Sequence, residues 1–511
     1  MSCRADREGP GDAGPRRHHA VRVRPAQGEG PGLSTVQAPA ATWPFGAEEQ
    51  TGRASRVQRG RAARSAVPRR SHGEWSPAPD RADPVRILSD QASTRLQELV
   101  PLRNERMAES PFAFYRGSAA VMASDLAASP VSGFRVQLCG DAHLSNFGGY
   151  AAPDRTLVFD LNDFDETLPG PWEWDVKRLV TSVEIAARDR GYGDRKRRKI
   201  VMTTSRAYRM AMREFASVGL LDVWYSRMTP ADIRARWGSS AGPRAHRALD
   251  RLVEKAMGKD SARASSKLTQ VIEGKPRFRS DPPLLVPVSE LLDREAHLVL
   301  EEVVRQSLRS YRHSLPRSRR HLLEQFRYAD AARKVVGVGS VGTRAWALLM
   351  LGVDDEPLVL QLKEAAESVL EPFAGKSKLH NHGQRVVAGQ QLLQASSDVF
   401  LGWTRIPALD GAARDFYVRQ LWDWKVSADV SRQDPATMAI YGQLCGWTLA
   451  RGHARSGDRI AIAAYLGGGD AFDEAMADFA ASYADQTERD HAGFVAACDQ
   501  DRLARSGHGR A

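Results

Sequence analysis

The sequence predicts a mixed α+β protein with more than one domain, and three observations support this prediction. Of its residues, 42% are hydrophobic and 26% are charged, which is typical of a globular protein. With 511 residues, the chain is too long to form one ordinary hydrophobic core. Apolar residues recur at helical spacing in segments on both sides of a compact stretch rich in β patterns. That stretch begins at residue 334, where short apolar segments are separated by glycines or paired aspartates.

Residues 1–85 are predicted to form a disordered basic tail. They hold 14 Arg against 9 acidic residues, which gives +5 of the total formal charge of +11. The stretch is rich in Gly, Pro and Ala and has no apolar period, so it offers little surface to bury. We expect only weak, non-specific contact of this tail with nucleic acid.

The sequence also predicts a cytoplasmic protein without a membrane partner. No apolar run approaches the roughly 18 residues that a membrane-spanning helix needs. The start of the chain lacks an apolar segment of the signal-peptide type. The four cysteines are scattered and form no C-x-x-C pair, which argues against a disulfide framework or a zinc knuckle.

Three ordered regions are expected after the tail. Residues 86–330 should form a mainly helical region, in which strands at 134–141 and 156–161 pair as a hairpin around the loop between them. A strong amphipathic pattern predicts a helix at 171–191, with Pro171 near its start and Gly191 at its end.

The remaining two regions follow the change of pattern. Residues 331–430 are predicted to be β-rich, with strand, glycine turn, strand, Asp-Asp turn and strand over 334–365 and a helix at 383–396. Residues 431–511 should add helices that complete the first region. A helix that ends in polar turn residues is expected at 441–458.

Two neighbouring segments, CGDAHLSNFGGY (139–150) and VFDLNDFDE (158–166), concentrate carboxylate and amide side chains. Phosphoryl transfer needs a carboxylate to orient or deprotonate the attacking hydroxyl, and oxygen ligands that hold Mg²⁺ against the phosphates. The spacing of Asp141 and Asn146 lets one loop supply both. Asp163 is favoured as the second metal ligand, and Asp160 remains an alternative. The plainer interpretation is an Asx-rich turn whose side chains cap backbone amides.

A third segment, GVGSVG (337–342), precedes a strand that carries Lys363. Glycines let a turn approach phosphates closely and point amides at them, and a lysine on the third strand would neutralise the phosphates. The gap of 21 residues from Gly342 to Lys363 suits this arrangement. The same glycine pattern also occurs in ordinary hairpins.

These segments carry a resemblance to known families. GDAHLSN resembles the catalytic loop of aminoglycoside and choline phosphotransferases, and NDFD resembles a kinase metal loop. From about residue 86 to 505, the chain closely resembles the domain of unknown function 2252 family of bacterial proteins, on RMAESPFAFYRGSA, CGDAHLSNFG, FDLNDFDETLPGPWEWDVKRL, VGVGSVGT, LQLKEA and LARGHARSGD. That family looks like a distant relative of the protein-kinase-like fold.

The distant resemblance implies a two-lobed kinase-like phosphotransferase that uses Mg²⁺ and ATP to modify a hydroxyl of a small molecule or protein. Asp141 would be the base and Asp175 an anchor for its loop, and His453 is given no catalytic role. Metal ligands would be Asn146 with Asp163 or Asp160, and the phosphate grip would comprise Gly337, Gly339, Gly342 and Lys363. In kinases the glycine turn precedes the catalytic loop, so the reversed order here implies a circular permutation.

Two departures from the kinase pattern leave other functions open. Cys139 stands where phosphotransferases usually have histidine, and Ala388 stands where a glutamate would pair with the strand lysine. Both would suit a non-catalytic, pseudokinase-like binding protein. A metal-dependent phosphoesterase is the other alternative, with a ligand set of Asp141, His143, Asp160, His380 and His382.

Overall fold

The fold was examined in a computed structural model of the chain. It describes residues 52–238, 261–291, 294–335, 337–407, 412–421 and 428–508, together with single positions between these ranges. Helices and antiparallel strands alternate along this part of the chain, which confirms the predicted α+β class. Most of the predicted tail, residues 1–51, lies outside the described residues.

The end of the predicted tail is folded, so the expected boundary at residue 85 is wrong for residues 52–85. Helix α1 (Arg53–Ala66) packs on α18 (Arg459–Leu466). Two of its arginines make specific contacts: Arg59 forms an ion pair of 2.6 Å with Asp458, and Nε of Arg64 donates to the carbonyl of Tyr465. Charged side chains that find buried acceptors can order a segment that lacks an apolar stripe.

One six-stranded antiparallel sheet has the strand order β11-β12-β10-β9-β8-β7. Its strands are β7 (Leu285–Pro287), β8 (Arg327–Lys334), β9 (Ala345–Leu351), β10 (Pro357–Ala365), β11 (Gly402–Pro407) and β12 (Ala413–Gln420). The predicted strands before and after the Asp-Asp turn are confirmed as β9 and β10, whereas the strand before the glycine turn, β8, ends at Lys334, where the predicted one began. The sheet also takes in β7, which lies before the predicted start of the β-rich region.

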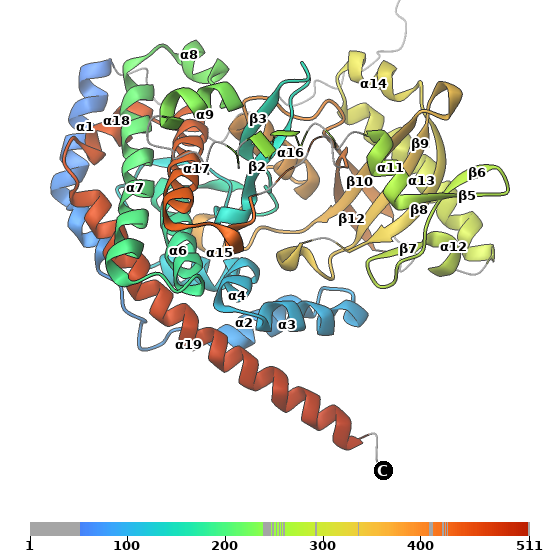
Figure 1. Cartoon of the computed structure of the whole chain (residues 1–511), viewed down its shortest axis with the longest axis horizontal. Helices are drawn as coiled ribbons and strands as arrows, with labels where there is room; N and C mark the ends of the chain where they lie inside the picture. The colour runs from blue at the N-terminus through green and yellow to red at the C-terminus, as the bar shows by residue number, and fades with distance from the viewer. Residues whose placement is uncertain are drawn as a thin grey trace, which may run out of the picture. The chain divides into compact units, whose positions relative to one another are not determined.

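Alternation along β9 explains why the sheet is covered on both faces. Leu348 and Met350 join a core with Tyr311 of helix α13 (Arg294–Ser314), whereas Leu349 and Leu351 join another with Phe278. Successive side chains point to opposite faces of a strand, so an uninterrupted apolar run predicts two buried faces. Figure 1 shows α13 beside this sheet, with α11 (Ser261–Leu268) and the hairpin β5 (Thr269–Ile272) and β6 (Lys275–Phe278) near it.

The helical region is built around α6 (Trp172–Asp189), which confirms the helix predicted at 171–191. It packs against α7 (Asp194–Ser217), α17 (Pro435–Ser456) and α19 (Ala471–His508), as Figure 1 shows. Their apolar faces form the largest core of the described residues. C-terminal helices therefore join a core begun some three hundred residues earlier, as predicted.

The predicted hairpin between the strands at 134–141 and 156–161 is wrong. Strand β1 (Arg135–Leu138) instead pairs with β4 (Leu168–Pro171), and β3 (Leu157–Leu161) pairs with β2 (Phe147–Ala151). The glycines in FGGYA and the prolines in LPGP hid β2 and β4, because both residue types are rare in strands. The loop between β1 and β2 therefore connects two small sheets.

The remaining helices lie around these elements. They are α2 (Pro84–Ala92), α3 (Val100–Ala108), α4 (Pro111–Gly117), α5 (Ala119–Leu126), α8 (Leu220–Tyr225), α9 (Pro230–Trp237), α12 (Val288–Leu291), α14 (Arg317–Leu323), α15 (Glu371–Ala374) and α16 (His382–Leu393). In the described part of the chain, no helix combines the length and apolar character needed to cross a membrane.

Candidate active site

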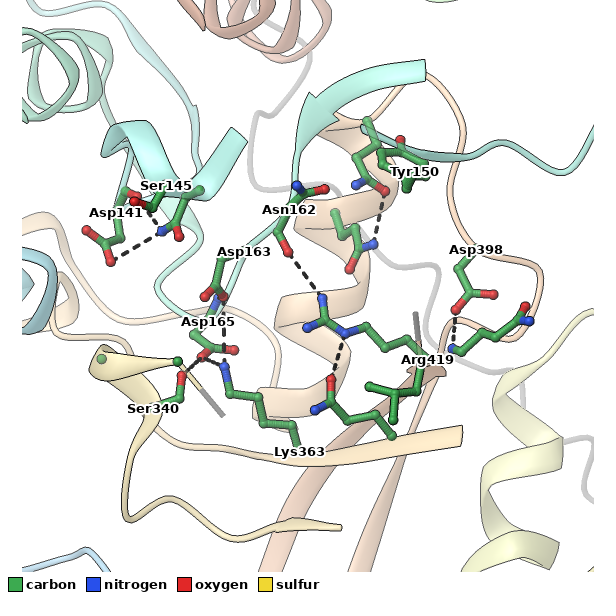
Figure 2. A pocket seen from close by; sticks show the side chains of 18 of the residues that line it. Asp141, Ser145, Tyr150, Asn162, Asp163, Asp165, Ser340, Lys363, Asp398 and Arg419 are labelled. Atoms are coloured by element: carbon green, nitrogen blue, oxygen red, sulfur yellow. Dashed lines mark hydrogen bonds and ion pairs between the residues drawn. The ribbon is translucent and has the colours of Figure 1, made fainter. Parts of the chain in front are cut away.

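A cavity of about 760 Å³ lies where the helical region meets the sheet. Three stretches of sequence line it: the N-terminal helices from Gln91 to Ala119, the loops from Asp141 to Glu166, and residues of the sheet region from Arg319 to Leu421. Of the predicted site residues, it gathers Asp141, Asn146, Asp163, Gly337, Gly339 and Lys363. Segments far apart in the chain therefore meet at one cavity, as Figure 2 illustrates.

The loop that carries Asp141 is anchored by Asp175, in agreement with the anchoring role predicted for it. The Asp175 carboxylate, 1% exposed, accepts hydrogen bonds from the backbone N–H groups of Cys139 (2.8 Å) and Gly140 (3.0 Å). Gly140 has a φ of +85°, and an added Cβ would lie 2.3 Å from the carbonyl oxygen of Glu166. Only glycine suits this tight passage.

Two further buried side chains support Asp175. Nε2 of His453 lies 3.2 Å from its carboxylate, and the hydroxyl of Tyr208 lies 2.9 Å from Nδ1 of the same histidine. His453 is 0% exposed and does not line the cavity. The hydrogen-bonded chain Tyr208–His453–Asp175 thus connects the helices to the loop.

Asp141 lies at the cavity with its two carboxylate oxygens in different surroundings. Oδ1 accepts from the guanidinium of Arg178 at 2.8 Å, and Arg178 stacks on the ring of Tyr115 at 3.9 Å. Oδ2 lies 3.4 Å from both Nδ2 of Asn146 and Nε2 of His143. Burial raises the pKa of Asp141, while Arg178 opposes this shift. One oxygen is thus held firmly and the other makes only long contacts.

Asn146 is fixed by the loop itself, since its Nδ2 donates to the backbone carbonyl of Asp141 at 2.8 Å. Its neighbour His143 is buried, and burial together with Arg116 and Arg178 lowers its pKa well below the usual value. His143 is therefore neutral at pH 7. The side chain of Asn146, the second residue of the predicted D-x-x-x-x-N pair, thus lies at the same cavity as Asp141.

Lys363 on β10 meets the aspartates of the NDFD segment. It forms an ion pair with Asp165, and its Nζ lies 3.9 Å from Oδ1 of Asp163. The Tyr417 hydroxyl donates to Asp165 at 2.9 Å, and the Ser340 hydroxyl donates to it at 3.4 Å. Figure 2 shows Lys363 reaching from its strand toward Asp163 and Asp165, with Ser340 beside them. The glycine turn, the lysine and the acidic loop therefore converge.

The charges of this cluster depend on one another. Burial lowers the pKa of Lys363, but the carboxylates of Asp163 and Asp165 more than offset this and raise it. Burial and the adjacent Asp165 raise the pKa of Asp163. Burial alone would raise the pKa of Asp165 as well, but the ion pair with Lys363 holds it below the usual value. Lys363 and Asp165 are thus a charged pair at pH 7.

Asp160, the predicted alternative to Asp163 as metal ligand, does not line the cavity. Its carboxylate is 1% exposed and forms an ion pair of 2.6 Å with Arg451 of α17. It also accepts from the backbone N–H groups of Leu161 (2.9 Å) and Ala395 (3.1 Å). Its oxygens are committed to structural contacts, so Asp163 is the one of the two that a ligand in the cavity can reach.

The glycine turn contains a short 3₁₀ helix, η5 (Val338–Ser340), between β8 and β9. Gly337 and Gly339 are exposed and line the cavity, whereas Gly342 is buried and does not. Gly342 has a φ of +88°, and its carbonyl accepts from the backbone N–H of Leu96 at 2.8 Å. Two of the three predicted phosphate-gripping glycines thus reach the cavity, and the third shapes the turn.

Helix α16 contributes a cation to this region, whereas the resemblance to kinases implied a glutamate on this helix. Ala388 lies on this helix, as predicted, and Arg385 of the same helix donates to the backbone carbonyls of Asp165, Thr167 and Ala366, each at 2.8 Å. The carboxylate that pairs with Lys363 comes from Asp165 instead. Lys363 is therefore paired although Ala388 stands where a glutamate would pair with it.

Sequence reasoning missed several residues of this site. Arg178 binds Asp141, Asp165 binds Lys363, and Arg419 on β12 donates to the carbonyl of Asn162 at 3.1 Å. Glu166 also lines the cavity, and burial raises its pKa to about 7. The repeated aspartate of NDFDE was a signal for Asp165. Nothing in the local pattern indicated Arg178 or Arg419, because their partners lie on other elements.

The ligand set proposed for a phosphoesterase is not gathered in this structure. His380, His382 and Asp160 do not line the cavity that holds Asp141 and His143. Across the described ranges, no three His, Cys, Asp or Glu side chains are grouped so that they could hold a metal ion by themselves.

Comparison with known proteins gives one match. No curated protein and no solved structure is significantly similar to the chain. A family model described as "Uncharacterized protein conserved in bacteria (DUF2252)" matches residues 95–497. This range contains every residue of the cavity discussed above apart from Gln91. The chain therefore belongs to the DUF2252 family.

Proposed function

We propose that the protein is a phosphotransferase that uses Mg²⁺ and ATP to modify a hydroxyl group, on a circularly permuted kinase-like fold. The observation that carries the proposal is the convergence of Lys363 and Ser340 from the sheet region on Asp163 and Asp165, in a cavity that also holds Asp141 and Asn146. A lysine and a glycine turn facing a base and metal-binding side chains form the set that phosphoryl transfer requires.

The order of elements around the cavity supports the kinase-like part of the proposal. Strand β8, the glycine turn, β9, β10 with Lys363 and helix α16 follow one another as the glycine loop, lysine strand and next helix of a kinase do. Helix α17, which comes after the sheet, contacts the loop that comes before it: the Tyr441 hydroxyl donates to the carbonyls of Leu144 (2.9 Å) and Phe147 (3.1 Å). In a permuted chain, a helix that follows the sheet has to pack beside the loop that precedes the sheet, as α17 does here.

Asp141 would act as the base. Its Oδ1 is held by Arg178, and its Oδ2 is left with long contacts at the cavity, where an acceptor hydroxyl would donate to it. Arg178 favours the ionised carboxylate, while burial raises its proton affinity, and both are useful in a base that works near neutral pH. Asp175, through the backbone of residues 139 and 140, would keep this oxygen in position.

Asn146 and Asp163 suit a magnesium ion. Asn146 uses its amide nitrogen within the loop, so its carboxamide oxygen has no hydrogen-bond partner in the described part of the chain. Asp163 makes only contacts of 3.4 Å and 3.9 Å through its Oδ1. Mg²⁺ is commonly held by one or two protein oxygens together with phosphates and waters, so two side chains suffice. When bound, the ion would neutralise the charge of the phosphates.

Lys363 would bind the phosphates of the nucleotide. Without a ligand its charge is balanced by Asp165 and Asp163, which also fix its direction. The ion pair with Asp165 would do what the pairing with a helix glutamate does in kinases. The acceptor is a small hydroxylated molecule or a protein.

The test is nucleotide binding and turnover by the purified protein. We expect ATP with Mg²⁺ or Mn²⁺ to raise the melting temperature of the wild type and ADP to form slowly in the presence of the acceptor. Asp163→Ala should abolish the metal-dependent part of the shift. Asp154→Ala is the matched control, because Asp154 is an exposed aspartate paired with Arg227 and does not line the cavity. A wild type that responds to neither ATP nor GTP would contradict the proposal.

A non-catalytic nucleotide-binding protein is the alternative outcome of the same experiment. It would give a metal-dependent shift that Asp163→Ala removes, but no formation of ADP with any acceptor and no effect of Asp141→Ala on turnover.

A further inference from the structure

One end of the cavity is lined by cations that the proposed phosphate grip does not use. Arg95 precedes η2 (Gln97–Leu99), and Arg116 lies in α4; both line the cavity together with Asp141 and the glycine turn. The carbonyl of Arg116 lies 3.1 Å from the position of a Cβ added to Gly339. Arg116 is therefore next to the turn and on the side of the cavity that holds the proposed base.

Arg116 has no acceptor for its guanidinium within the described residues. Its Nε is out of contact with solvent and makes no hydrogen bond, and no ion pair of its side chain is present in the described part. An arginine has five N–H donors and stays charged, so a largely buried one without an acceptor costs free energy unless an anion binds to it. Arg116 thus indicates an anionic ligand.

Two further positive features line the cavity together with Arg116. Arg95 donates from Nη1 to the carbonyl of Val341 at 2.6 Å, while its Nε also has no partner. Helix α5 begins at Ala119, which lines the cavity, and no side chain caps its first turn. The partial positive charge at the start of a helix adds to that of the arginines.

The acidic groups at this end are compensated. Asp141 is paired with Arg178, and Glu166 accepts from the backbone N–H of Val369 at 2.8 Å. Burial raises the pKa of Glu166 to about 7, which favours its uncharged form. Neither carboxylate contacts the Arg116 guanidinium within hydrogen-bonding distance, in the ranges that the structure describes.

We propose that Arg116, assisted by Arg95, forms a binding site for a phosphoryl group between the glycine turn and Asp141. For the identity of its ligand the inference rests on the proposed function. Two sources have the required chemistry: the terminal phosphoryl group of the nucleotide, which lies next to the base in any phosphotransferase, and a phosphate on the acceptor. Arginine suits either, because its planar donors match phosphate oxygens in pairs.

The test measures binding of three probes by titration calorimetry: the non-hydrolysable ATP analogue AMP-PNP with Mg²⁺, ADP with Mg²⁺, and inorganic phosphate added to the protein saturated with Mg²⁺ and AMP-PNP. The variants are Arg116→Met, which keeps much of the side-chain volume, and Arg116→Lys. Arg319→Met is the matched control, because Arg319 of α14 lines the same cavity from the sheet region. Melting temperatures without ligand establish that each variant is folded.

If the site holds the nucleotide's terminal phosphoryl group, Arg116→Met weakens AMP-PNP binding at least tenfold, leaves ADP within twofold, and Arg116→Lys recovers part of the loss. If it holds the acceptor's phosphate, the variant binds both nucleotides normally but loses the phosphate binding of the wild type. Arg319→Met shows neither effect. Equal binding of all three probes by wild type and Arg116→Met would overturn the inference while leaving the proposed function intact.

A failure of the proposed function would look different. The wild type would then bind neither nucleotide. Phosphate added to the unliganded protein would still test the site: binding that Arg116→Met removes would support it, and binding that the variant keeps, or no binding at all, would overturn it.

Discussion

The two sides of the cavity differ in how firmly they are held. The loop at 139–146 is mostly buried: Asp175 accepts from two of its backbone N–H groups, and Ser182 accepts from that of Leu144 at 3.1 Å. The glycine turn at 337–342 exposes Gly337 and Gly339, and its hydrogen bonds to other elements involve Arg95, Leu96 and Asp165. The proposed base is thus preorganised, whereas the turn is free to adjust to a ligand.

The largest effect on stability is expected when the loop at 139–146 loses the Asp175 carboxylate that anchors it. Asp175→Ala removes the acceptor of two buried N–H groups and leaves His453 without its carboxylate. Each buried donor left without a partner costs about 1–3 kcal/mol, so we expect a loss of about 3 kcal/mol or more in the free energy of unfolding. Denaturant titration measures this loss. Asp154→Ala, at an exposed pair, should stay within about 0.5 kcal/mol of the wild type.

The second effect is on ligand binding rather than on stability. Asp163→Asn removes a carboxylate that makes only long contacts, so the variant should be as stable as the wild type. The affinity of the variant for ATP in the presence of Mg²⁺ should fall on the order of 100-fold. Even residues that only support the metal ligands contribute 10–100-fold to metal affinity or activity. Calorimetry with and without Mg²⁺ separates the metal-dependent part. An unchanged affinity would mean that Asp163 is not a metal ligand.

The third effect is a pH dependence of the free energy of unfolding, and it comes from Glu166, which lies between the two sides of the cavity. Burial raises the pKa of Glu166 from 4.5 to about 7, against the effect of Arg385. Its protonated form is therefore favoured in the folded protein. The resulting stabilisation is complete below about pH 4.5 and is lost as the pH rises through about 7.

Glu166→Gln should remove this contribution, which is about 3 kcal/mol for a shift from 4.5 to about 7 at 1.36 kcal/mol per pKa unit. The free energy of unfolding of the variant should fall less between pH 5 and 7.5 than that of the wild type. Glu173, whose pKa burial also raises to about 7, still contributes in both proteins. Parallel curves for the two proteins would contradict the assignment.

The smallest effect on stability is expected in the glycine turn, where two of the glycines should respond differently to substitution. Gly342 has a φ of +88°, so Gly342→Ala should destabilise the protein by about 1 kcal/mol. A Cβ at Gly337 would meet nothing within 4 Å, and its φ is not positive. Gly337→Ala should therefore leave the melting temperature nearly unchanged and alter only nucleotide affinity. A reversed order of the two stabilities would show that the turn is held differently.

Local patterns predicted the polar residues of the site well. The spacing of Asp141, Asn146 and Asp163 and the placement of Lys363 on a third strand were available from the sequence, and all four line the cavity. The anchoring contact of Asp175 agrees with the role that the resemblance to kinases implied for it. These residues could be found because each lies within, or just after, a strand or helix with a clear apolar pattern.

What could not be predicted are pairings between distant elements. Arg178 and Asp141 are separated by a strand hairpin, and Arg451 takes Asp160 out of the cavity from almost three hundred residues away. Sequence spacing gives no information on such contacts. The ordered helix α1 was missed for a related reason, since its stability comes from arginines that bind distant carbonyls and carboxylates rather than from an apolar stripe.

Labelling with an ATP acyl phosphate tests the central claim most directly, since this reagent transfers its acyl group to lysines next to bound nucleotide phosphates. The wild-type protein should be modified at Lys363, and excess ATP with Mg²⁺ should prevent the reaction. Peptide mass spectrometry identifies the site. Modification of other lysines alone, or labelling of Lys363 that ATP does not reduce, would contradict the claim that these two distant parts of the chain form one nucleotide site.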